Sequence, residues 1–168
     1  YGERVAAATK SSDFQLTGTT DTAETISDAL ASGRTQLSEF ESKQALSEAD
    51  LPITPFELAT SPDDARDAAA SVDGPVAMKI VSPDIVHKSE AGGVALEVST
   101  EAASDTYDDL LAAARDYDPG AQIDGVLVSP MADAGVELIV GVVDDDQFGP
   151  VVMCGLGGVF VEVLEDVA

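Results

Sequence analysis

The sequence is poor in the residues that build disulfides and metal centres. Its 168 residues include one cysteine, one histidine and no tryptophan. A single cysteine cannot form a disulfide within the chain, and Cys154 and His87 alone cannot provide the four ligands of a zinc site. This cysteine usage is typical of a reducing, cytoplasmic compartment.

Positive charge is equally scarce. The chain holds 8 lysines and arginines against 32 aspartates and glutamates, for a net charge of −24 at pH 7. Such a charge repels phosphate backbones and anionic lipids, which argues against a nucleic-acid or membrane partner. Because the acidic residues are spread along the whole chain, we interpret them as a solvated surface of the halophilic type, with nucleic-acid mimicry as the second interpretation.

No stretch approaches the ~18 consecutive apolar residues of a membrane-spanning helix. The best apolar run, Val151–Val161, is shorter and is interrupted by three glycines. The chain begins with Tyr1 and ends inside an apolar, strand-like pattern, so we expect it to be part of a longer protein. Apolar residues make up 45% of the composition, enough for a hydrophobic core.

Residues 1–36 differ from the rest and are expected to form a junction, because residues 11–22 are rich in Ser, Thr and Gly. From residue 37 onward, periodicity and turn residues predict alternating helices and strands. The helices are expected to begin at Ser38, Thr60 and Thr100, and the strands to cover residues 51–55, 75–82, 93–99, 123–131, 136–143 and 147–156. This order of elements is typical of the α/β or α+β class.

Local signals mark two of the helix starts. Ser38 and Glu41 have the spacing of a capping box. The segment Ser61–Asp64 combines a capping residue, a proline for the first turn and two acidic residues at the positive end of the helix dipole.

The stretch KIVSPDIVHKSEAGG, from Lys79 to Gly93, concentrates the scarce basic groups. Two of the chain's four lysines, Lys79 and Lys88, and its only histidine fall within ten residues. A strand lysine can hold a phosphate, the Gly-Gly pair lets backbone N–H groups approach phosphate oxygens, and His87 is a competent nucleophile for phosphoryl transfer. The alternatives are a surface histidine, a simple turn and a lysine that extends into solvent.

Several separate segments, in one order, resemble a known family: SPDIVHKSEAGGV after the Lys79 strand, then GVLVSPM and GVELIVGVVDDDQFGPVVMCGLGGVFVEVLEDV. They are similar to the ATP-grasp domain (β part) of ADP-forming acyl-CoA (acetate–CoA) synthetases and, more distantly, to the β subunit of succinyl-CoA synthetase. The resemblance covers about residues 37–168. It implies an ATP-grasp fold that is incomplete at its C-terminus, with residues 1–36 as the junction after a CoA-binding α part.

The resemblance assigns roles to individual residues. His87 matches the phosphohistidine that relays phosphate between a histidine of the α part and ADP. Lys79 matches the lysine that contacts nucleotide phosphates, and Glu137 matches a nucleotide-contacting glutamate. The remaining nucleotide-binding, loop and site-lining positions are Lys88, Ser129, Met131, Ser89, Gly92, Gly93 and Glu162.

The implied reaction is acyl-CoA + ADP + phosphate giving carboxylate + CoA + ATP, reversibly, catalysed by an acid–thiol ligase. Its cofactors would be ATP or ADP and Mg²⁺, with the magnesium ligands in a Glu-x-Asn-Pro type segment expected beyond residue 168. The fragment alone is therefore expected to be inactive. The implied partner is a CoA-binding α part, fused or separate, in an oligomer.

Two other functions stay open at this point. The same domain could be a regulatory, non-catalytic ATP-grasp module fused to a protein acyltransferase, or it could be an acidic scaffold that binds no nucleotide. The chain departs from the family where Val143 precedes Asp144, since a basic residue is usual there, and where Glu90 follows HKS, since Asp is common there. It also has Ser129-Pro130 at the hinge where other ATP-grasp members carry an acidic residue. Within the apolar segments, Phe148 and Cys154 are expected to be buried.

Overall fold

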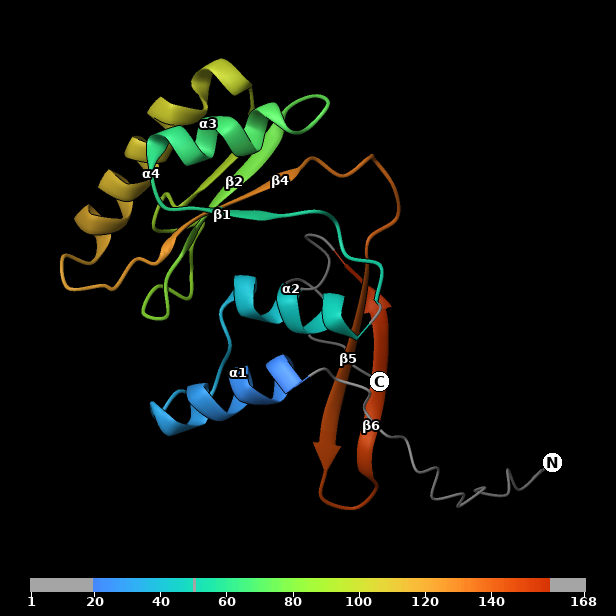
Figure 1. Cartoon of the computed structure of the whole chain (residues 1–168). Helices are drawn as coiled ribbons and strands as arrows, with labels where there is room; N and C mark the ends of the chain where they lie inside the picture. The colour runs from blue at the N-terminus through green and yellow to red at the C-terminus, as the bar shows by residue number, and fades with distance from the viewer. Residues whose placement is uncertain (1–19, 50, 158–168) are drawn as a thin grey trace. The chain divides into compact units, whose positions relative to one another are not determined.

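The computed structural model describes residues 20–49 and 51–157, which form two compact units divided after Met131. The first unit contains helices α1 (Thr20–Ala31), α2 (Glu39–Glu48), α3 (Pro62–Ala70) and α4 (Ala103–Tyr117), with a 3₁₀ turn at Thr100–Ala102. Its strands are β1 (Glu57–Ala59), β2 (Val76–Val81), β3 (Val94–Val98) and β4 (Gly125–Pro130). The second unit contains β5 (Leu138–Asp145) and β6 (Gly149–Leu156) (Figure 1). None of the helices in these ranges is both long and apolar enough to cross a membrane.

The strands of the first unit form an antiparallel sheet in the order β1-β4-β2-β3. Lys79 of β2 lies opposite Leu127 of β4 and Val94 of β3. Because successive residues of a strand point to opposite faces, Met78 and Ile80 lie on one face and Lys79 on the other. The sheet therefore has one face for the core and one that carries a charged group.

Helices α3 and α4 pack against the Met78 face (Figure 1). Ala65 of α3 and Ala114 of α4 are fully buried, and small side chains of this kind let a helix approach the strands closely. Met78 and Ile80 are also fully buried, and each such side chain stabilises the fold by roughly 1.5–3 kcal/mol. This core holds β2 rigidly and so fixes the backbone position of Lys79.

Both predicted helix caps are confirmed. Ser38 Oγ accepts a hydrogen bond from the N–H of Glu41 at 3.2 Å, and the Glu41 carboxylate accepts one from the N–H of Ser38 at 2.7 Å. Ser61 Oγ accepts a hydrogen bond from the N–H of Asp64 at 3.1 Å and caps α3. These interactions are local in sequence, which is why the sequence predicted them.

Three details differ from the prediction. Helix α1 lies within the segment that was interpreted as a junction, and the first strand covers Glu57–Ala59 instead of residues 51–55. The third difference is a bulge in β3, where the pairing with β2 shifts and Glu97 adopts a φ of 56°. As a result Leu96, which strict alternation placed inside, is 58% exposed.

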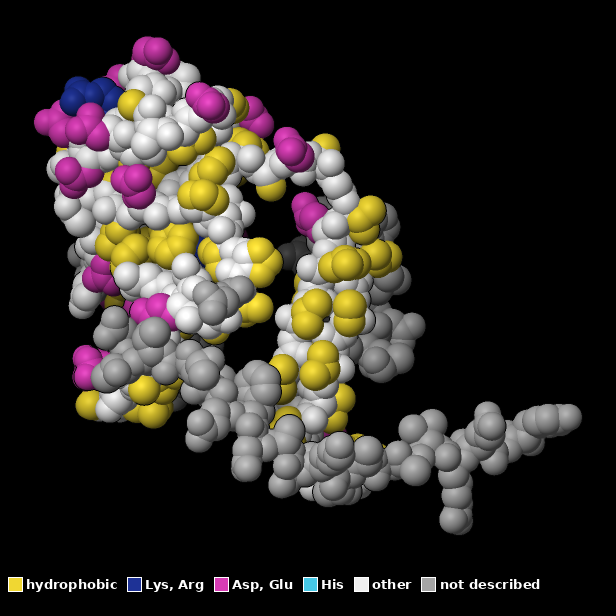
Figure 2. All heavy atoms as spheres, turned by 45° about the vertical axis from the view of Figure 1, so that its right-hand side comes forward, with side chains coloured by type: hydrophobic (Ala, Val, Ile, Leu, Met, Phe, Trp, Pro, Cys, Tyr) yellow, Lys and Arg dark blue, Asp and Glu magenta, His cyan; other side chains and the backbone are white. Residues whose placement is uncertain are grey.

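The predicted hairpin of the second unit forms, because β5 and β6 pair antiparallel along their length. Asp145 Oδ1 accepts hydrogen bonds from the N–H groups of Gln147 (2.8 Å) and Phe148 (3.0 Å) and closes the turn. The burial predicted for this hairpin was wrong: Cys154 is exposed and Phe148 is 80% exposed. Within residues 132–157 no third element covers the two strands, so their apolar side chains remain in view (Figure 2).

Candidate functional site

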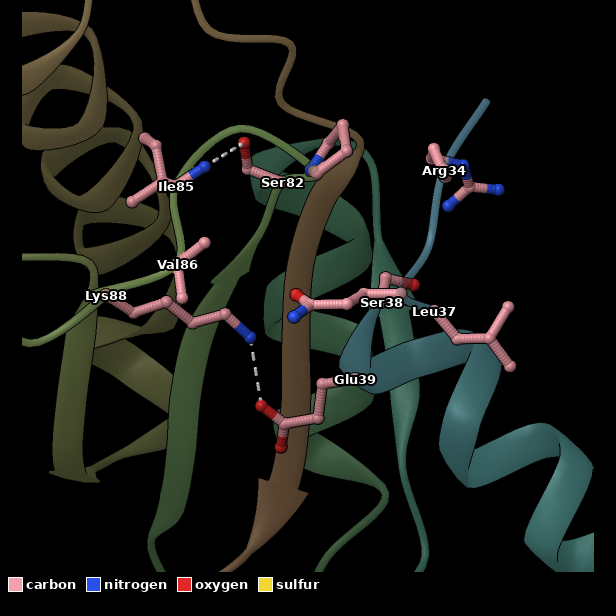
Figure 3. A pocket seen from close by; sticks show the side chains of 10 residues that line it. Arg34, Leu37, Ser38, Glu39, Ser82, Ile85, Val86 and Lys88 are labelled. Carbon is pink, nitrogen blue, oxygen red and sulfur yellow. Dashed lines mark hydrogen bonds and ion pairs between the residues drawn. The ribbon is translucent and has the colours of Figure 1, made fainter. Parts of the chain in front are cut away.

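Two lysines from different segments meet on one carboxylate in the first unit. Lys79 Nζ, from β2, lies 3.3 Å from Oε1 of Glu39, and Lys88 Nζ, from the loop after β2, lies 3.0 Å from Oε2. Figure 3 shows the Lys88 side chain extending to Glu39, the first residue of α2. The structure thus joins the two lysines predicted for one anion site and adds a carboxylate that the sequence analysis missed.

These three side chains are partly withdrawn from water, with exposed fractions of 20% for Lys88, 27% for Glu39 and 35% for Lys79. Burial alone would raise the pKa of Glu39. The hydrogen bond from Lys88 and the charge of Lys79 outweigh this effect, so the pKa of Glu39 lies below its ordinary value. At neutral pH the group has two positive charges and one negative charge, which leaves a local excess of positive charge on a strongly acidic protein.

His87 lies on the loop between β2 and β3, and this loop is anchored on both sides of it. Before His87, Ser82 Oγ accepts a hydrogen bond from the N–H of Ile85 at 3.2 Å, and the Ile85 side chain is buried in the core. After it, the N–H of Gly93 donates to the carbonyl of Lys88 at 2.7 Å. His87 itself is exposed. The loop therefore presents the imidazole to solvent directly beside Lys88. We call Lys79, Lys88 and Glu39 together the cationic group, because they carry a net positive charge.

Gly92 and Gly93 have a structural role within the loop. The N–H of Gly92 donates to the carbonyl of Ser89 at 3.2 Å, and that of Gly93 to Lys88, so the N–H groups that we expected near phosphate oxygens are already used. Gly92 has a φ of 66°, which favours glycine. A Cβ on Gly93 would lie 2.5 Å from Cγ1 of Ile80. Turn conformation and close packing, rather than a phosphate, explain both glycines.

Ser129 and Met131 lie at the end of β4. Ser129 shares the sheet face of Lys79, because it stands two residues from Leu127, the partner of Lys79 in the register. Met131 follows the strand directly, and its N–H donates to the carbonyl of Pro75 at 3.4 Å. Ser129 is therefore on the same side of the sheet as the cationic group.

The two remaining predicted positions are glutamates. Glu137 belongs to the second unit, where it is exposed and its carbonyl accepts a hydrogen bond from the N–H of Gly157 at 2.8 Å. Glu162 lies outside the described residues. Among residues 20–49 and 51–157 there is no group of three His, Cys, Asp or Glu side chains that could hold a metal ion.

A cleft of about 160 Å³ opens beside Lys88 and Glu39 (Figure 3). The start of α2 forms one wall, and the loop after β2 forms the other. The lining residues are Arg34, Gln36, Leu37, Ser38, Glu39, Ser82, Pro83, Ile85, Val86 and Lys88. The cleft therefore provides free space directly next to the cationic group.

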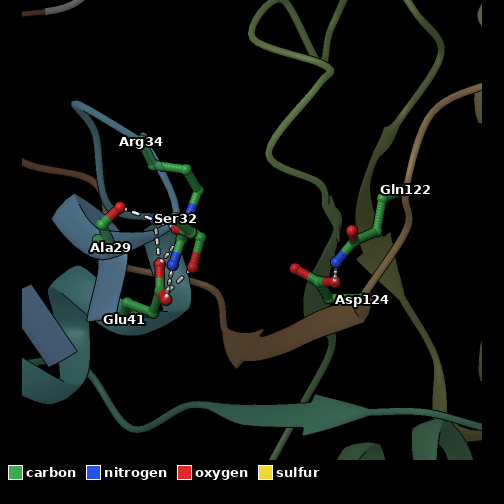
Figure 4. A network of polar contacts seen from close by, with 7 residues as sticks. Ala29, Ser32, Arg34, Glu41, Gln122 and Asp124 are labelled. Carbon is green, nitrogen blue, oxygen red and sulfur yellow. Dashed lines mark hydrogen bonds and ion pairs between the residues drawn. The ribbon is translucent and has the colours of Figure 1, made fainter.

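Arg34 fixes the start of α2 (Figure 4). Each of its two terminal nitrogens donates to one carboxylate oxygen of Glu41 at 2.9 Å, and its Nε donates to Ser32 Oγ at 3.3 Å. The hydrogen bond from Arg34 outweighs the opposing effect of burial and, with the Ser38 N–H, lowers the pKa of Glu41 to about 2. This network holds the first turn of α2 without using Glu39.

Residues 28–168 match the family of ATP-grasp domains. The chain belongs to the ATP-grasp family. The β subunit of acetate–CoA ligase [ADP-forming] II from Pyrococcus furiosus is 46% identical to it over 143 residues, which are 84% of this chain and 61% of that protein. The ATP-grasp chain thus spans about three-fifths of the length of this relative.

Solved structures show the same likeness. Dinucleotide forming acetyl-coenzyme A synthetase 1 from Ca. Korarchaeum cryptofilum, in complex with coenzyme A, Ca-AMPCP and HgCl⁺, matches with a TM-score of 0.81 and 41% identity over 88% of this chain and 65% of that one. Its complex with coenzyme A and Mg-AMPPCP, with the phosphohistidine segment pointing towards the nucleotide binding site, has a TM-score of 0.70 and 36% identity over 88% and 62%. The predicted ATP-grasp fold is confirmed.

Neutralising Glu41 should destabilise this ATP-grasp domain at neutral pH and have less effect in acid. The pKa of Glu41 in the fold, about 2, is below its ordinary value of 4.5, so the carboxylate stabilises the fold above pH 4.5 and loses this contribution as the pH falls through 2. We expect the difference in free energy of unfolding between wild type and Glu41→Gln, from chemical denaturation at constant salt, to shrink from neutral pH towards pH 2. A difference that does not change with pH would contradict this.

Proposed function

We propose that this chain is the nucleotide-binding and phosphohistidine-relay part of an ADP-forming acetate–CoA synthetase, which converts acyl-CoA, ADP and phosphate into carboxylate, CoA and ATP. The observation that carries the proposal is the placement of His87. It is exposed on a loop anchored on both sides, directly before Lys88, which joins Lys79 in a cationic group. The phosphohistidine segment named for the Korarchaeum structure supports this role.

In the direction of ATP synthesis, the phosphoryl group on His87 passes to an oxygen of the β-phosphate of ADP. The N–P bond breaks, its electron pair stays on the ring nitrogen, and the new O–P bond forms. A proton carried on the other ring nitrogen of the phosphohistidine lets the ring leave as neutral imidazole. Lys79 and Lys88 would offset the negative charge of the phosphates during this step. The anchored loop limits the positions that the imidazole can reach, which lowers the entropy lost when it meets the nucleotide.

The other assignments belong to the same proposal. Ser129 and Met131 would contact the nucleotide at the end of β4. Glu137 and Glu162 keep the roles that the resemblance implies for them, as a nucleotide-contacting and a site-lining glutamate. Ser89, Gly92 and Gly93 would shape the phosphohistidine loop. Magnesium supplies charge neutralisation on the phosphates when bound, but the described residues do not form a site for it, and we expect its ligands beyond residue 168.

The wider assembly is also proposed. Residues 1–36 would join the ATP-grasp domain to a CoA-binding α part, fused or separate, in an oligomeric enzyme of a halophilic cytoplasm. The P. furiosus relative is named as a β subunit, which supports a second, CoA-binding component. The regulatory alternative finds no support in the relatives reported above, which are named as a ligase and a synthetase.

Phosphoryl labelling tests this function. The complete enzyme would be incubated with γ-labelled ATP and Mg²⁺ in high salt, and the label would be mapped by proteolysis and tested for acid lability. We expect acid-labile label on the peptide that contains His87, and no label in His87→Ala. Glu90→Gln, an exposed change in the same loop, should keep the label. Nucleotide binding without label at His87 would reject the relay.

A further inference from the structure

We infer that Glu39 is a displaceable counter-anion: its carboxylate occupies the phosphate position between Lys79 and Lys88, and an arriving nucleotide phosphate expels it. This inference rests on the proposed nucleotide site. Each oxygen of Glu39 faces one ammonium group, at 3.3 Å and 3.0 Å. Carboxylate and phosphate oxygens bind ammonium groups through the same charge-assisted hydrogen bonds, so the carboxylate occupies the kind of place that a phosphate would take.

Simultaneous binding is unfavourable. If both lysines contacted a phosphate while Glu39 stayed between them, its carboxylate would lie within a few ångströms of the phosphate oxygens, and like charges at that distance repel. The two lysines together carry two positive charges, and Glu39 cancels one of them. When the Glu39 carboxylate leaves the site, its repulsion of the phosphate ends, and both positive charges of the lysines act on the phosphate.

The fold lets Glu39 leave without loosening α2. The first turn of this helix is held by the capping box of Ser38 and Glu41 and by Arg34, none of which involves the Glu39 side chain. Glu39 is also the first residue of α2, so its carboxylate remains near the positive end of the helix dipole after rotating away. The neighbouring cleft of about 160 Å³ gives it room to move.

A tethered counter-anion gives the site a selectivity for highly charged ligands. A monovalent anion gains little by replacing a carboxylate that is already in place, whereas a di- or triphosphate offers more charge and more oxygens to the two lysines. Glu39 is therefore a specificity-determining residue, and it discriminates by competing with the weaker anions for the two lysines.

Calorimetric titration of the complete enzyme with ADP tests the inference. Glu39→Gln keeps the shape of the side chain and removes its charge, so we expect ADP to bind about three- to tenfold more tightly than to wild type. Glu39→Ala should shift the affinity in the same direction. Asp109→Asn removes one charge from an exposed position on α4, on the opposite side of the sheet, and should leave the affinity unchanged.

The opposite results have distinct meanings. If Glu39→Gln retains its far-ultraviolet circular dichroism and thermal stability but binds ADP more weakly or equally, Glu39 positions the lysines or is irrelevant to binding, and displacement is wrong. A matching gain in Asp109→Asn would show a general charge effect and would also overturn the inference. If wild type, Glu39→Gln and Glu39→Ala all fail to bind ADP, the proposed nucleotide site itself fails.

Discussion

Replacing Lys79 with methionine should slow phosphorylation of His87 by about two to three orders of magnitude, because a preorganised positive group is lost from the site of charge development. Lys79 is well suited to this role, since its neighbours Met78 and Ile80 are fully buried and fix the strand that carries it. Methionine keeps most of the length and volume of lysine. The loss should therefore reflect the charge rather than a collapse of β2.

Single-turnover labelling with γ-labelled ATP would measure this rate in the complete enzyme. Lys43→Met is the matched control, because Lys43 Nζ lies 5.5 Å from the Phe56 ring centroid and, among the described residues, the ion pairs of Glu39 are with Lys79 and Lys88. It should retain the wild-type rate. A Lys79→Met enzyme that labels His87 as fast as Lys43→Met would remove Lys79 from the phosphate site, whatever its place in the sheet.

The parts of the fold that the sequence predicted correctly depend on neighbours in the chain. Ser38 and Glu41 are three residues apart, and a helix start brings such residues together wherever it occurs. The strand of Lys79, VAMKIV, is apolar apart from that lysine, and a short run of this kind directly after Gly74-Pro75 is typical of a buried strand. In both cases the sequence signal and the structural feature cover the same few residues.

The pairing of Glu39 with the two lysines could not be predicted in this way. Glu39 is 40 residues from Lys79 and 49 from Lys88, and no periodicity links a helix start to a loop at that separation. Charge counting indicated two lysines near one another but gave no sign of the carboxylate between them. The family resemblance did not help, because it named only positions that match a known motif.

Burial in the hairpin was mispredicted for a related reason. The apolar patterns of β5 and β6 identify which side chains avoid water, but not what lies against them, and Phe148 and Cys154 are exposed in the structure. The bulge at Glu97 had a similar effect on β3, since one extra residue moved Leu96 from the inner to the outer face. The burial of these three side chains therefore depends on packing and strand pairing that the local sequence pattern does not specify.

Gly93→Ala should destabilise the first unit by about 1–3 kcal/mol, the usual range for forcing an extra methyl group into a packed site. The added Cβ would lie 2.5 Å from Cγ1 and 2.6 Å from Cδ1 of Ile80, which is fully buried and cannot move away freely. Gly120→Ala is the control, because its Cβ would meet only Asp118 Oδ1 at an ordinary 3.5 Å. Chemical denaturation of all three proteins would measure the difference.

A second substitution shows whether the clash with Ile80 is the cause. Ile80→Ala should by itself destabilise the fold by about 2–5 kcal/mol through the cavity it leaves. It also removes the two carbons nearest to the new methyl group and leaves the carbonyl oxygen of Lys88, at 3.1 Å, as its remaining close contact. Gly93→Ala should therefore cost less in that background, and the double variant should be more stable than the sum of the single changes predicts. Strict additivity would mean that Gly93 is required by the conformation of the His87 loop and not by its contact with β2.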